Sequence, residues 1–462
     1  MLSPPLIARL RSLVGDEHVR TDQHTRHLYG TDALNRGVPA DVVVLPGSTA
    51  DVAAVVRLCG EHRIPIVPRG LGSGYTGGAV PLHGGIVLAL DRMNRIIEID
   101  VQNLIAIVEP NVVTGDLQDA VERLGLFYPP DPASLRLSSI GGNVAECAGG
   151  PRAFKYGTTK QYVLGLEAVL PTGEIIETGG KVVKNVVGYD LTHLLVGSEG
   201  TLAIITRIVL RLIPKPPGQA TLRACFARVE GAVAAVSNIV GARVVPASLE
   251  LVDAESLEAV AAYAKSRSLA AEGTGAILLL DVDGVPSAVE EEAARVEQAC
   301  RDAGATEVVR ARDEDERSEL WRVRRELSYS LKTVASLKFN HDVVVPKARI
   351  PELFALVDRL RSDFRLRIPL FGHAGDGNIH VNIMVDAADA EAIARARQAE
   401  RVLFEGVIAL EGSITGEHGI GFSKAPYLPI ELSDDEIALM KRIKQAFDPL
   451  GILNPGKIFP AL

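Results

Sequence analysis

The glycine-rich segment 68–85, PRGLGSGYTGGAVPLHGG, constrains the fold of this chain more than any other segment. Seven glycines lie within residues 70–85, and bare backbone N–H groups of such a loop can point into a concavity and bind an anion. Gly72 to Gly77 also matches G-x-G-x-x-G, but a nicotinamide-binding Rossmann fold needs a helix directly after that pattern. Pro81 and the strand-like IVLAL follow instead, so we reject the Rossmann reading. A flexible glycine hairpin is the alternative that this segment alone leaves open.

Two further loops of the same half of the chain are rich in glycine, serine and other small residues. Segment 129–150 reads PPDPASLRLSSIGGNVAECAGG, and segment 196–206 reads VGSEGTLAIIT. Small residues allow backbone to approach a phosphate or a flat ring closely. Three such loops in one region argue against the flexible hairpin and predict a binding site for a large, phosphate-bearing ligand.

Composition excludes several classes of protein. The net charge is −9 and no basic cluster stands out, so binding to nucleic acid is not expected. The four cysteines are isolated and form no CxxC, which argues against an iron–sulfur cluster or a zinc ribbon and fits a reducing compartment. Apolar runs are short, so no transmembrane segment is expected, and the predicted location is the cytoplasm.

Strand-like and helix-like segments alternate on both sides of a proline-rich linker, IPKPPG, at 213–218. Beyond the linker, helices are predicted near 313–333, 389–410 and 434–447, with only short strands between 334 and 388. The pattern predicts an α+β protein whose second part is a helix-covered, ferredoxin-like sheet. The predicted divisions are an N-terminal helical segment 1–40, a first domain 41–215, a second domain 216–425 and a C-terminal helix and tail 426–462.

Chemically active side chains gather in two short motifs, FGHAGDGNIHVNIMV and SITGEHGIGFSK. In the first motif, a tight Gly-Asp-Gly turn can fold His373 back towards His380. Glu417 of the second motif could add a carboxylate, and two imidazoles with one carboxylate form a three-ligand metal site. The alternative is a plain hairpin with ordinary surface histidines, because this spacing alone is no metal signature.

Several of these motifs together resemble a known family. PRGLGSGYTGGA, PDPAS, SIGGNVAECAGG, KYGTTKQYVLGLEAVLPTGE and VGSEGTLAIIT are similar to the FAD-binding domain of vanillyl-alcohol-oxidase type flavoproteins. GHAGDGNIH, SITGEHGIG and the closing LNPGKIFP resemble the C-terminal half of FAD-linked 2-hydroxyacid dehydrogenases. The resemblance implies a two-part FAD-binding domain, a ferredoxin-like substrate (cap) domain and a C-terminal segment that returns to the FAD domain.

The resemblance also implies which residues contact FAD. The implied set is Arg69, Gly70, Gly72, Ser73, Gly74, Thr76, Gly77 and Gly78 at the pyrophosphate, Ser134, Ser139, Gly142, Asn143 and Gly150 along the flavin and ribityl chain, Glu199, Gly200 and Ile205 near the adenine or the ring, and Asn454. Some relatives attach FAD covalently through a histidine of the first loop. GLGSGYTGG contains none, so FAD is expected to bind non-covalently. Ala203 stands where relatives often have glycine.

By the same resemblance, His373, His380 and Glu417 would bind a divalent metal, with Zn²⁺ as the first expectation, and His418 would be the general base. Asn382 would help to hold the substrate. The segment LWRVRRELSYSLK offers Arg324 as the anchor for a substrate carboxylate, because its planar fork suits a bidentate contact. The alternative interpretation is that these arginines form a solvated helix face. Lys338 and Asn340 are weaker candidates for the contact to the substrate carboxylate.

The implied activity is oxidation of a D-2-hydroxyacid, glycolate or D-lactate in the first place, to the 2-oxoacid with hydride transfer to flavin N5. A D-2-hydroxyglutarate dehydrogenase, a flavin electron-transfer subunit without its own substrate and a zinc hydrolase are the alternatives. The expected electron acceptor is another protein, a quinone or further oxidase subunits, which could attach the protein peripherally to the inner membrane.

Overall fold

The computed structural model describes residues 2–34 and 37–459, and the chain forms two compact units. Unit 1 comprises residues 1–149, 158–215 and 417–462, and unit 2 comprises residues 150–157 and 216–416. None of the helices in these described stretches has both the length and the apolar character that crossing a bilayer requires. Of the closing motif LNPGKIFP, Pro460 lies outside the described residues.

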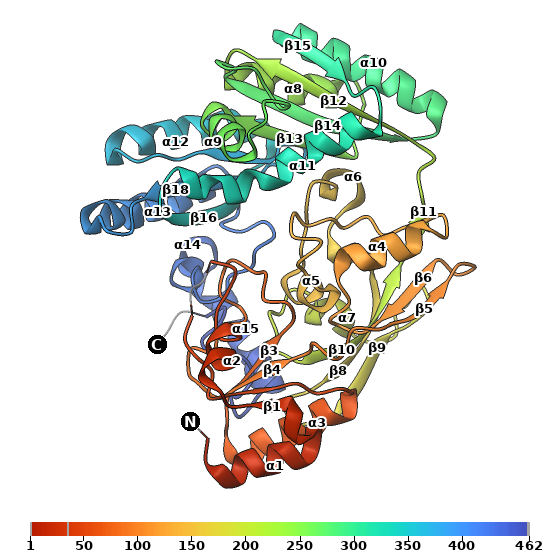
Figure 1. The fold of residues 1–462 in the computed structure, drawn as a ribbon, viewed down its shortest axis with the longest axis vertical. Coiled ribbons are helices and arrows are strands. Elements are labelled where there is room, and N and C mark those ends of the chain that lie inside the picture. Colours follow the sequence, from red (N-terminus) through yellow and green to blue (C-terminus); the bar gives the residue numbers. More distant parts are fainter. Residues whose placement is uncertain (1, 35–36, 460–462) are drawn as a thin grey trace. The chain divides into compact units, whose positions relative to one another are not determined.

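Unit 1 is built on two main sheets and a short ribbon (Figure 1). The four-stranded sheet has the order β1 (Val19–Arg20), β2 (Val42–Val44), β4 (Ile86–Ala89), β3 (Ile66–Arg69), with β4 parallel to both neighbours. The five-stranded antiparallel sheet has the order β5 (Ile96–Asp100), β6 (Ile105–Val108), β10 (Ile204–Arg211), β8 (Val163–Val169), β9 (Ile175–Gly179), and β11 (Ile213–Pro214) pairs with β7 (Leu126–Phe127).

Helix α3 (Thr49–His62) packs into a hydrophobic core of unit 1. The Ser48 side chain caps its first turn by accepting from the Asp51 N–H, and Val52, Val55 and Val56 are buried. The other helices of unit 1 are α1 (Pro4–Val14), α2 (Gln23–Leu28), α4 (Thr114–Glu122), α5 (Ile140–Glu146), α7 (Leu191–Leu195), α14 (Leu428–Glu431) and α15 (Asp434–Phe447), with the 3₁₀ turns η1 (Asp16–His18), η2 (Thr159–Tyr162) and η5 (Ala425–Tyr427).

The C-terminal segment is part of unit 1, as expected from the sequence. The Asn454 N–H donates to the main-chain oxygen of Ile66 at 2.7 Å, and the Ile66 N–H donates to Ile452 at 2.8 Å. Both bonds join the segment after α15 to strand β3, which leads into the glycine-rich loop.

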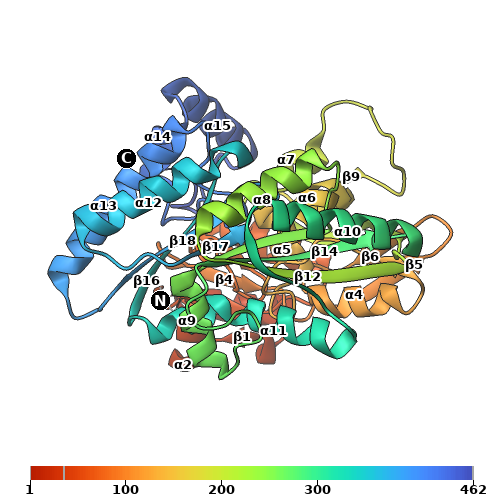
Figure 2. The same cartoon turned by 90° about the horizontal axis from the view of Figure 1, so that it is seen from above.

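Unit 2 contains one seven-stranded antiparallel sheet (Figure 2). Its order is β15 (Ala305–Arg310), β12 (Gly218–Phe226), β14 (Ala276–Gly284), β13 (Ser248–Asp253), β17 (Leu370–His373), β18 (Asn378–Val385), β16 (Leu337–Val344). Every residue of β18, NIHVNIMV, is buried, so its polar side chains do not lie on a solvent-facing side of the strand.

Helices cover both faces of this sheet. On one face, α9 (Ala254–Ala264) and α11 (Glu314–Ser330) pack on an apolar cluster that includes Val252, Ile277 and Phe371. Figure 2 shows α8 (Val229–Gly241) and α10 (Pro286–Asp302) lying along β12 and β14. The remaining helical elements are α6 (Ala153–Tyr156), η3 (Leu331–Thr333), η4 (Lys347–Arg349), α12 (Ile350–Phe364) and α13 (Ala390–Ala409).

The sequence-based expectation of only short strands between 334 and 388 was wrong for α12. Its sequence, IPELFALVDRLRSDF, carries a proline in the first turn, where the missing N–H costs nothing, and buries Leu353, Leu356 and Val357 on one side.

Candidate functional site

The first glycine loop of unit 1 keeps several backbone donors available. In the part of the chain that the structure describes, the N–H groups of Gly72, Ser73 and Gly74 donate no hydrogen bond. A Cβ built on Gly74 would meet no atom within 4 Å, so the loop is open at this point. Arg69 lies beneath the loop, where Nη1 donates to the main-chain oxygen of Thr31 at 2.7 Å and burial lowers the pKa of the guanidinium.

The second loop ends in α5, which Ser139 caps by accepting from the Gly142 N–H at 3.3 Å. The Asn143 side chain donates to Thr114 Oγ1 at 2.7 Å, so its amide fastens α5 to the start of α4. A buried polar atom, Oδ1 of Asn111, has no hydrogen-bond partner among the described residues. These side chains form a polar surface next to the first glycine loop.

The other predicted FAD residues lie in different elements. Ser134 lies in the second loop, Ile205 on β10 and Gly200 between α7 and β10, whereas Gly150 is the first residue of the unit 2 segment 150–157.

Glu199 has a role that the sequence did not indicate. It is buried, and its two carboxylate oxygens accept from the N–H groups of Ile420 and Gly421, both at 2.7 Å. Burial raises the pKa of this carboxyl, although those two donors and Lys457 oppose the rise. The loop after Glu417 is therefore held on the third glycine loop by Glu199.

Asn454 joins two of the glycine loops. Its Nδ2 donates to the main-chain oxygens of Gly78 at 2.9 Å and Glu199 at 2.7 Å, and its side chain is buried. The first loop also fits closely against the segment after Glu417, because a Cβ on Gly77 would lie 2.1 Å from the ring of Phe422.

His418 lies against the first glycine loop. Thr76 Oγ1 donates to its main-chain oxygen at 2.9 Å, and its ring packs edge-on against Tyr75, with 5.1 Å between ring centroids. Its Nε2 is 3.9 Å from Oε1 of Glu417, and its side chain is 14% exposed. Within unit 1, the predicted base thus lies beside the predicted pyrophosphate loop.

The predicted hairpin of unit 2 brings its two histidines together. Strands β17 and β18 pair directly across the Gly-Asp-Gly turn, and the rings of His373 and His380 lie edge-on with centroids 5.4 Å apart. Glu417 follows Gly416, the last residue of unit 2, whose N–H donates to the Asp342 main chain at 2.8 Å. His373 and His380 each offer a ring nitrogen as a ligand atom, and Glu417, the third predicted ligand, is the first residue of the unit 1 segment that follows Gly416.

Sequence reasoning missed Glu250, which lies beside this hairpin. Glu250 on β13 pairs in register with His373 and is fully buried. Oε1 accepts from Nδ1 of His373 at 2.5 Å, and Oε2 forms an ion pair with Arg324 of α11. Burial alone would raise the pKa of Glu250, but the charges of Arg324 and His373 outweigh it and lower the pKa to about 2.

Arg324 is buried, so the alternative of a solvated helix face does not apply to it. Its Nε has no hydrogen-bond partner among the described residues, and its guanidinium carbon lies 5.0 Å from the centre of the Phe371 ring. Arg322, by contrast, is exposed and pairs with Glu319 and Glu326 along the helix. Of these two, Arg324 keeps a buried donor for a further acceptor.

The remaining candidate substrate-binding residues of unit 2 lie on the neighbouring strands β16 and β18. Asn382 is fully buried; its Oδ1 accepts from Asn340 at 2.7 Å, and its Nδ2 donates to the main-chain oxygens of Pro369 and His380. Oδ1 of Asn340 has no hydrogen-bond partner in the described part of the chain. Lys338 donates to Ser328, and burial lowers the pKa of its ammonium to about 8.

Comparison with known families matches both halves of the chain. Residues 40–179 match a model described as an FAD binding domain, and residues 215–458 match a model of the C-terminal domain of FAD linked oxidases. Among solved structures, p-cresol methylhydroxylase aligns with a TM-score of 0.81 at 19% identity over 98% of this chain and 96% of that chain. A 4-ethylphenol oxidase from Gulosibacter chungangensis aligns with a TM-score of 0.78 at 23% identity, over 99% and 97%. These likenesses confirm the expected fold class.

Two curated relatives are similar over their full length. The glycolate oxidase subunit GlcD of Bacillus subtilis is 41% identical, with 99% of this chain and 97% of the relative covered. A D-lactate dehydrogenase of Anaerostipes hadrus is 37% identical, with 98% and 95% covered. The family resemblance inferred from the motifs is therefore confirmed: the chain belongs to the FAD-linked oxidases and is an FAD-dependent oxidoreductase.

Proposed function

We propose that this protein oxidises a small D-2-hydroxyacid, glycolate or D-lactate, to the 2-oxoacid. The observation that carries the proposal is the buried pair of His373 and His380 on one hairpin of unit 2, together with the adjacent Glu417 and His418 that follow unit 2 in the chain. The names of the two relatives, glycolate oxidase subunit and D-lactate dehydrogenase, support a CH–OH donor that also bears a carboxylate.

The glycine loops of unit 1 fit FAD. Three successive N–H groups without partners at Gly72 to Gly74, beside a loop open enough for close approach, suit a pyrophosphate. The unpartnered Oδ1 of Asn111 supplies a buried acceptor nearby. Bound FAD would supply a two-electron acceptor for the hydride from C2 of the substrate. The stretch GLGSGYTGG (70–78) has no histidine, so we expect FAD to be held without a covalent bond.

The donor set of His373, His380 and Glu417 fits a divalent metal, Zn²⁺ first. Two imidazole nitrogens and one carboxylate oxygen are typical of zinc sites that keep a position open for substrate. A bound metal would supply Lewis acidity towards the substrate hydroxyl. The short bond from Nδ1 of His373 to Glu250 supports ligation through the other ring nitrogen.

The side chains of this protein bind and orient the substrate and move its proton. Arg324 anchors the carboxylate, using the Nε–H that has no partner among the described residues. Asn382 helps to hold the substrate through its neighbour Asn340, to which its amide is bonded. His418 takes the hydroxyl proton as the hydride leaves, a role for which imidazole is well suited at neutral pH.

Two alternatives to this function remain open. A larger pocket at the substrate side chain would make D-2-hydroxyglutarate the substrate. A flavin subunit that only passes electrons would need none of the four residues His373, His380, Glu417 and His418. We expect electrons to leave to a partner protein, a quinone or further oxidase subunits, with the protein in the cytoplasm or attached to the inner membrane through such partners.

Anaerobic titration of the purified holoprotein tests the proposal. Glycolate or D-lactate should bleach the flavin absorbance, whereas L-lactate should not. Bleaching by D-2-hydroxyglutarate alone would identify the first alternative. A yellow protein that none of these acids bleaches, but that dithionite reduces, would contradict the proposed function.

A further inference from the structure

We propose that Glu250 is a positioning residue that fixes the metal ligand His373 and the carboxylate anchor Arg324 relative to each other. The inference rests on the proposed function, since it concerns the same site. Glu250 touches both groups with one carboxylate: Oε1 bonds Nδ1 of His373 at 2.5 Å, and Oε2 pairs with Arg324.

On the histidine side, the bond sets the tautomer. The Glu250 carboxylate is fully buried and paired with Arg324, so its Oε1 accepts this hydrogen bond and Nδ1 of His373 carries the hydrogen. Nε2 is then the ring nitrogen whose lone pair a metal would accept. Metal-binding histidines generally donate their second N–H to a carboxylate or carbonyl in this way, and the partner fixes the orientation of the ring.

On the arginine side, the same carboxylate holds the guanidinium in place. Arg324 lies on helix α11, and 74 positions of sequence separate it from Glu250. Its guanidinium carbon is also 5.0 Å from the centre of the Phe371 ring, two residues before His373 on β17. Strand β17 and Glu250 therefore define where the unpartnered Nε–H of Arg324 points.

The consequence is that one side chain determines the spacing between the metal ligand and the carboxylate anchor. Opposite charges also cancel within the pair of Glu250 and Arg324, both of which are buried. Removing the negative charge would leave the guanidinium buried without compensation, so it would move or take another acceptor. Both metal affinity and substrate binding should then suffer from one substitution.

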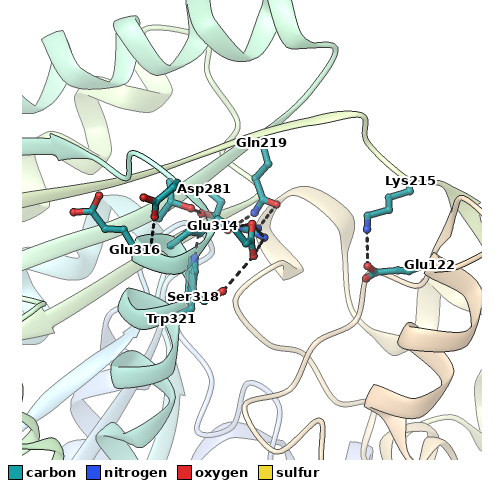
Figure 3. A network of polar contacts seen from close by, with 11 residues as sticks. Glu122, Lys215, Gln219, Asp281, Glu314, Glu316, Ser318 and Trp321 are labelled. Carbon is teal, nitrogen blue, oxygen red and sulfur yellow. Dashed lines mark hydrogen bonds and ion pairs between the residues drawn. The ribbon is translucent and has the colours of Figure 1, made fainter.

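The test is Glu250→Gln in the full-length FAD-loaded protein, with Asp281→Asn as the matched control. Asp281 is a second buried carboxylate of the same sheet (Figure 3), bonded to Thr221, Gln219 and Trp321. Asp281 on β14 pairs in register with Ser248 of β13, which lies two residues before Glu250. Asp281 contacts none of the proposed metal ligands. The control therefore measures what replacing a buried, hydrogen-bonded carboxyl group by an amide does without the two functional contacts.

The measurements are Co²⁺ affinity by chelator competition, the visible absorption bands of bound Co²⁺, and KM against kcat for the acid that bleaches the flavin. Glu250→Gln should weaken Co²⁺ binding about 10- to 100-fold, change the Co²⁺ bands and raise KM about tenfold or more. Asp281→Asn should keep wild-type Co²⁺ binding and bands. Equal Co²⁺ affinity and KM in Glu250→Gln and wild type would overturn the inference.

Two further outcomes separate the inference from the function on which it rests. Wild-type protein that binds no Co²⁺ would overturn the metal site and this inference together. If Glu250→Gln does not fold, Arg324→Lys decides: it leaves the bond from Glu250 to His373 intact, so KM should rise while Co²⁺ affinity stays at the wild-type value. Loss of Co²⁺ affinity with unchanged KM in Arg324→Lys would contradict the proposed division of roles.

Discussion

At the scale of single residues, the histidine pair depends on the turn that joins its strands. Gly377 has a φ of +87°, and a Cβ there would lie 1.9 Å from the Val345 main-chain oxygen, so only glycine fits. The motif GHAGDGNIH allowed this hairpin to be predicted because both strands and the turn are local in sequence. Glu250 could not be predicted, since it lies 123 positions from His373, in a strand whose short sequence, SLELVD, carries no motif.

His380→Ala should remove the metal from the purified protein. His380 is one of three proposed ligands, and two remaining ligands hold a divalent ion much more weakly. His341→Ala is the matched control, because His341 is also a buried histidine of the adjacent strand β16, in edge-on contact with Phe404. Elemental analysis should give about one metal per chain for the control and almost none for His380→Ala; full metal content in His380→Ala would remove it from the ligand set.

Gly74→Ala should lower FAD affinity without lowering stability. A Cβ on Gly74 meets no atom of the protein within 4 Å, so the methyl group can only obstruct something that the loop binds. Gly241→Ala, near the end of α8, also adds a methyl group in open space and is the control. We expect about tenfold weaker FAD binding for Gly74→Ala at an unchanged melting temperature, measured by flavin fluorescence during dilution. Wild-type FAD affinity would contradict the pyrophosphate assignment.

At the scale of elements, the segments with strong periodicity could be predicted, and α12 could not. The long helices α11, α13 and α15 lie where their apolar spacing and caps predict, for example the capping box of Ser433 and Glu436 at α15. In α12, Pro351 and the short apolar runs also suit strands, and only the packing of Leu353 and Leu356 in unit 2 decides for a helix.

The loop between β9 and α7 extends away from the rest of unit 1 (Figure 2). Val186 and Tyr189 are 96% and 95% exposed, so little packing holds this backbone. Limited trypsin digestion should therefore cut first after Lys184, which lies in this loop, as mass spectrometry of the fragments can show. Lys444, whose ammonium bonds Thr201, Asp448 and Leu453, is the internal comparison and should resist. A first cut elsewhere would show that the loop is packed in solution.

At the scale of the whole molecule, the order of the segments along the chain does not show which segments belong to which unit. Segment 150–157 belongs to unit 2 although both flanks belong to unit 1. Lys155 and Tyr156 donate to the Asp283 carboxylate at 2.5 and 2.7 Å, across 128 and 127 positions of sequence. Such long-range anchoring leaves no local pattern, whereas the proline-rich linker at 213–218 could be recognised from composition alone.

Three buried thiols can report on the two units separately. Burial raises the pKa of Cys59 in unit 1 to about 12, and those of Cys225 and Cys300 in unit 2 to about 11 and about 12. Because the thiolate reacts, all three should be labelled more slowly than the partly exposed Cys147. In mild denaturant, FAD should slow labelling of Cys59, and Zn²⁺ should slow labelling of Cys225 and Cys300. Labelling of Cys59 that FAD does not slow would contradict the assignment of FAD to the glycine loops of unit 1.

The most direct test of the account is stopped-flow reduction of the flavin in His418→Gln under anaerobic conditions. Its control is His193→Gln, which changes a histidine of α7 that pairs with Asp190 near the surface. We expect His418→Gln to bind FAD, to stay yellow with saturating substrate and still to be reduced by dithionite, because only the acceptor for the hydroxyl proton is missing. Reduction of His418→Gln by substrate at the wild-type rate would contradict it.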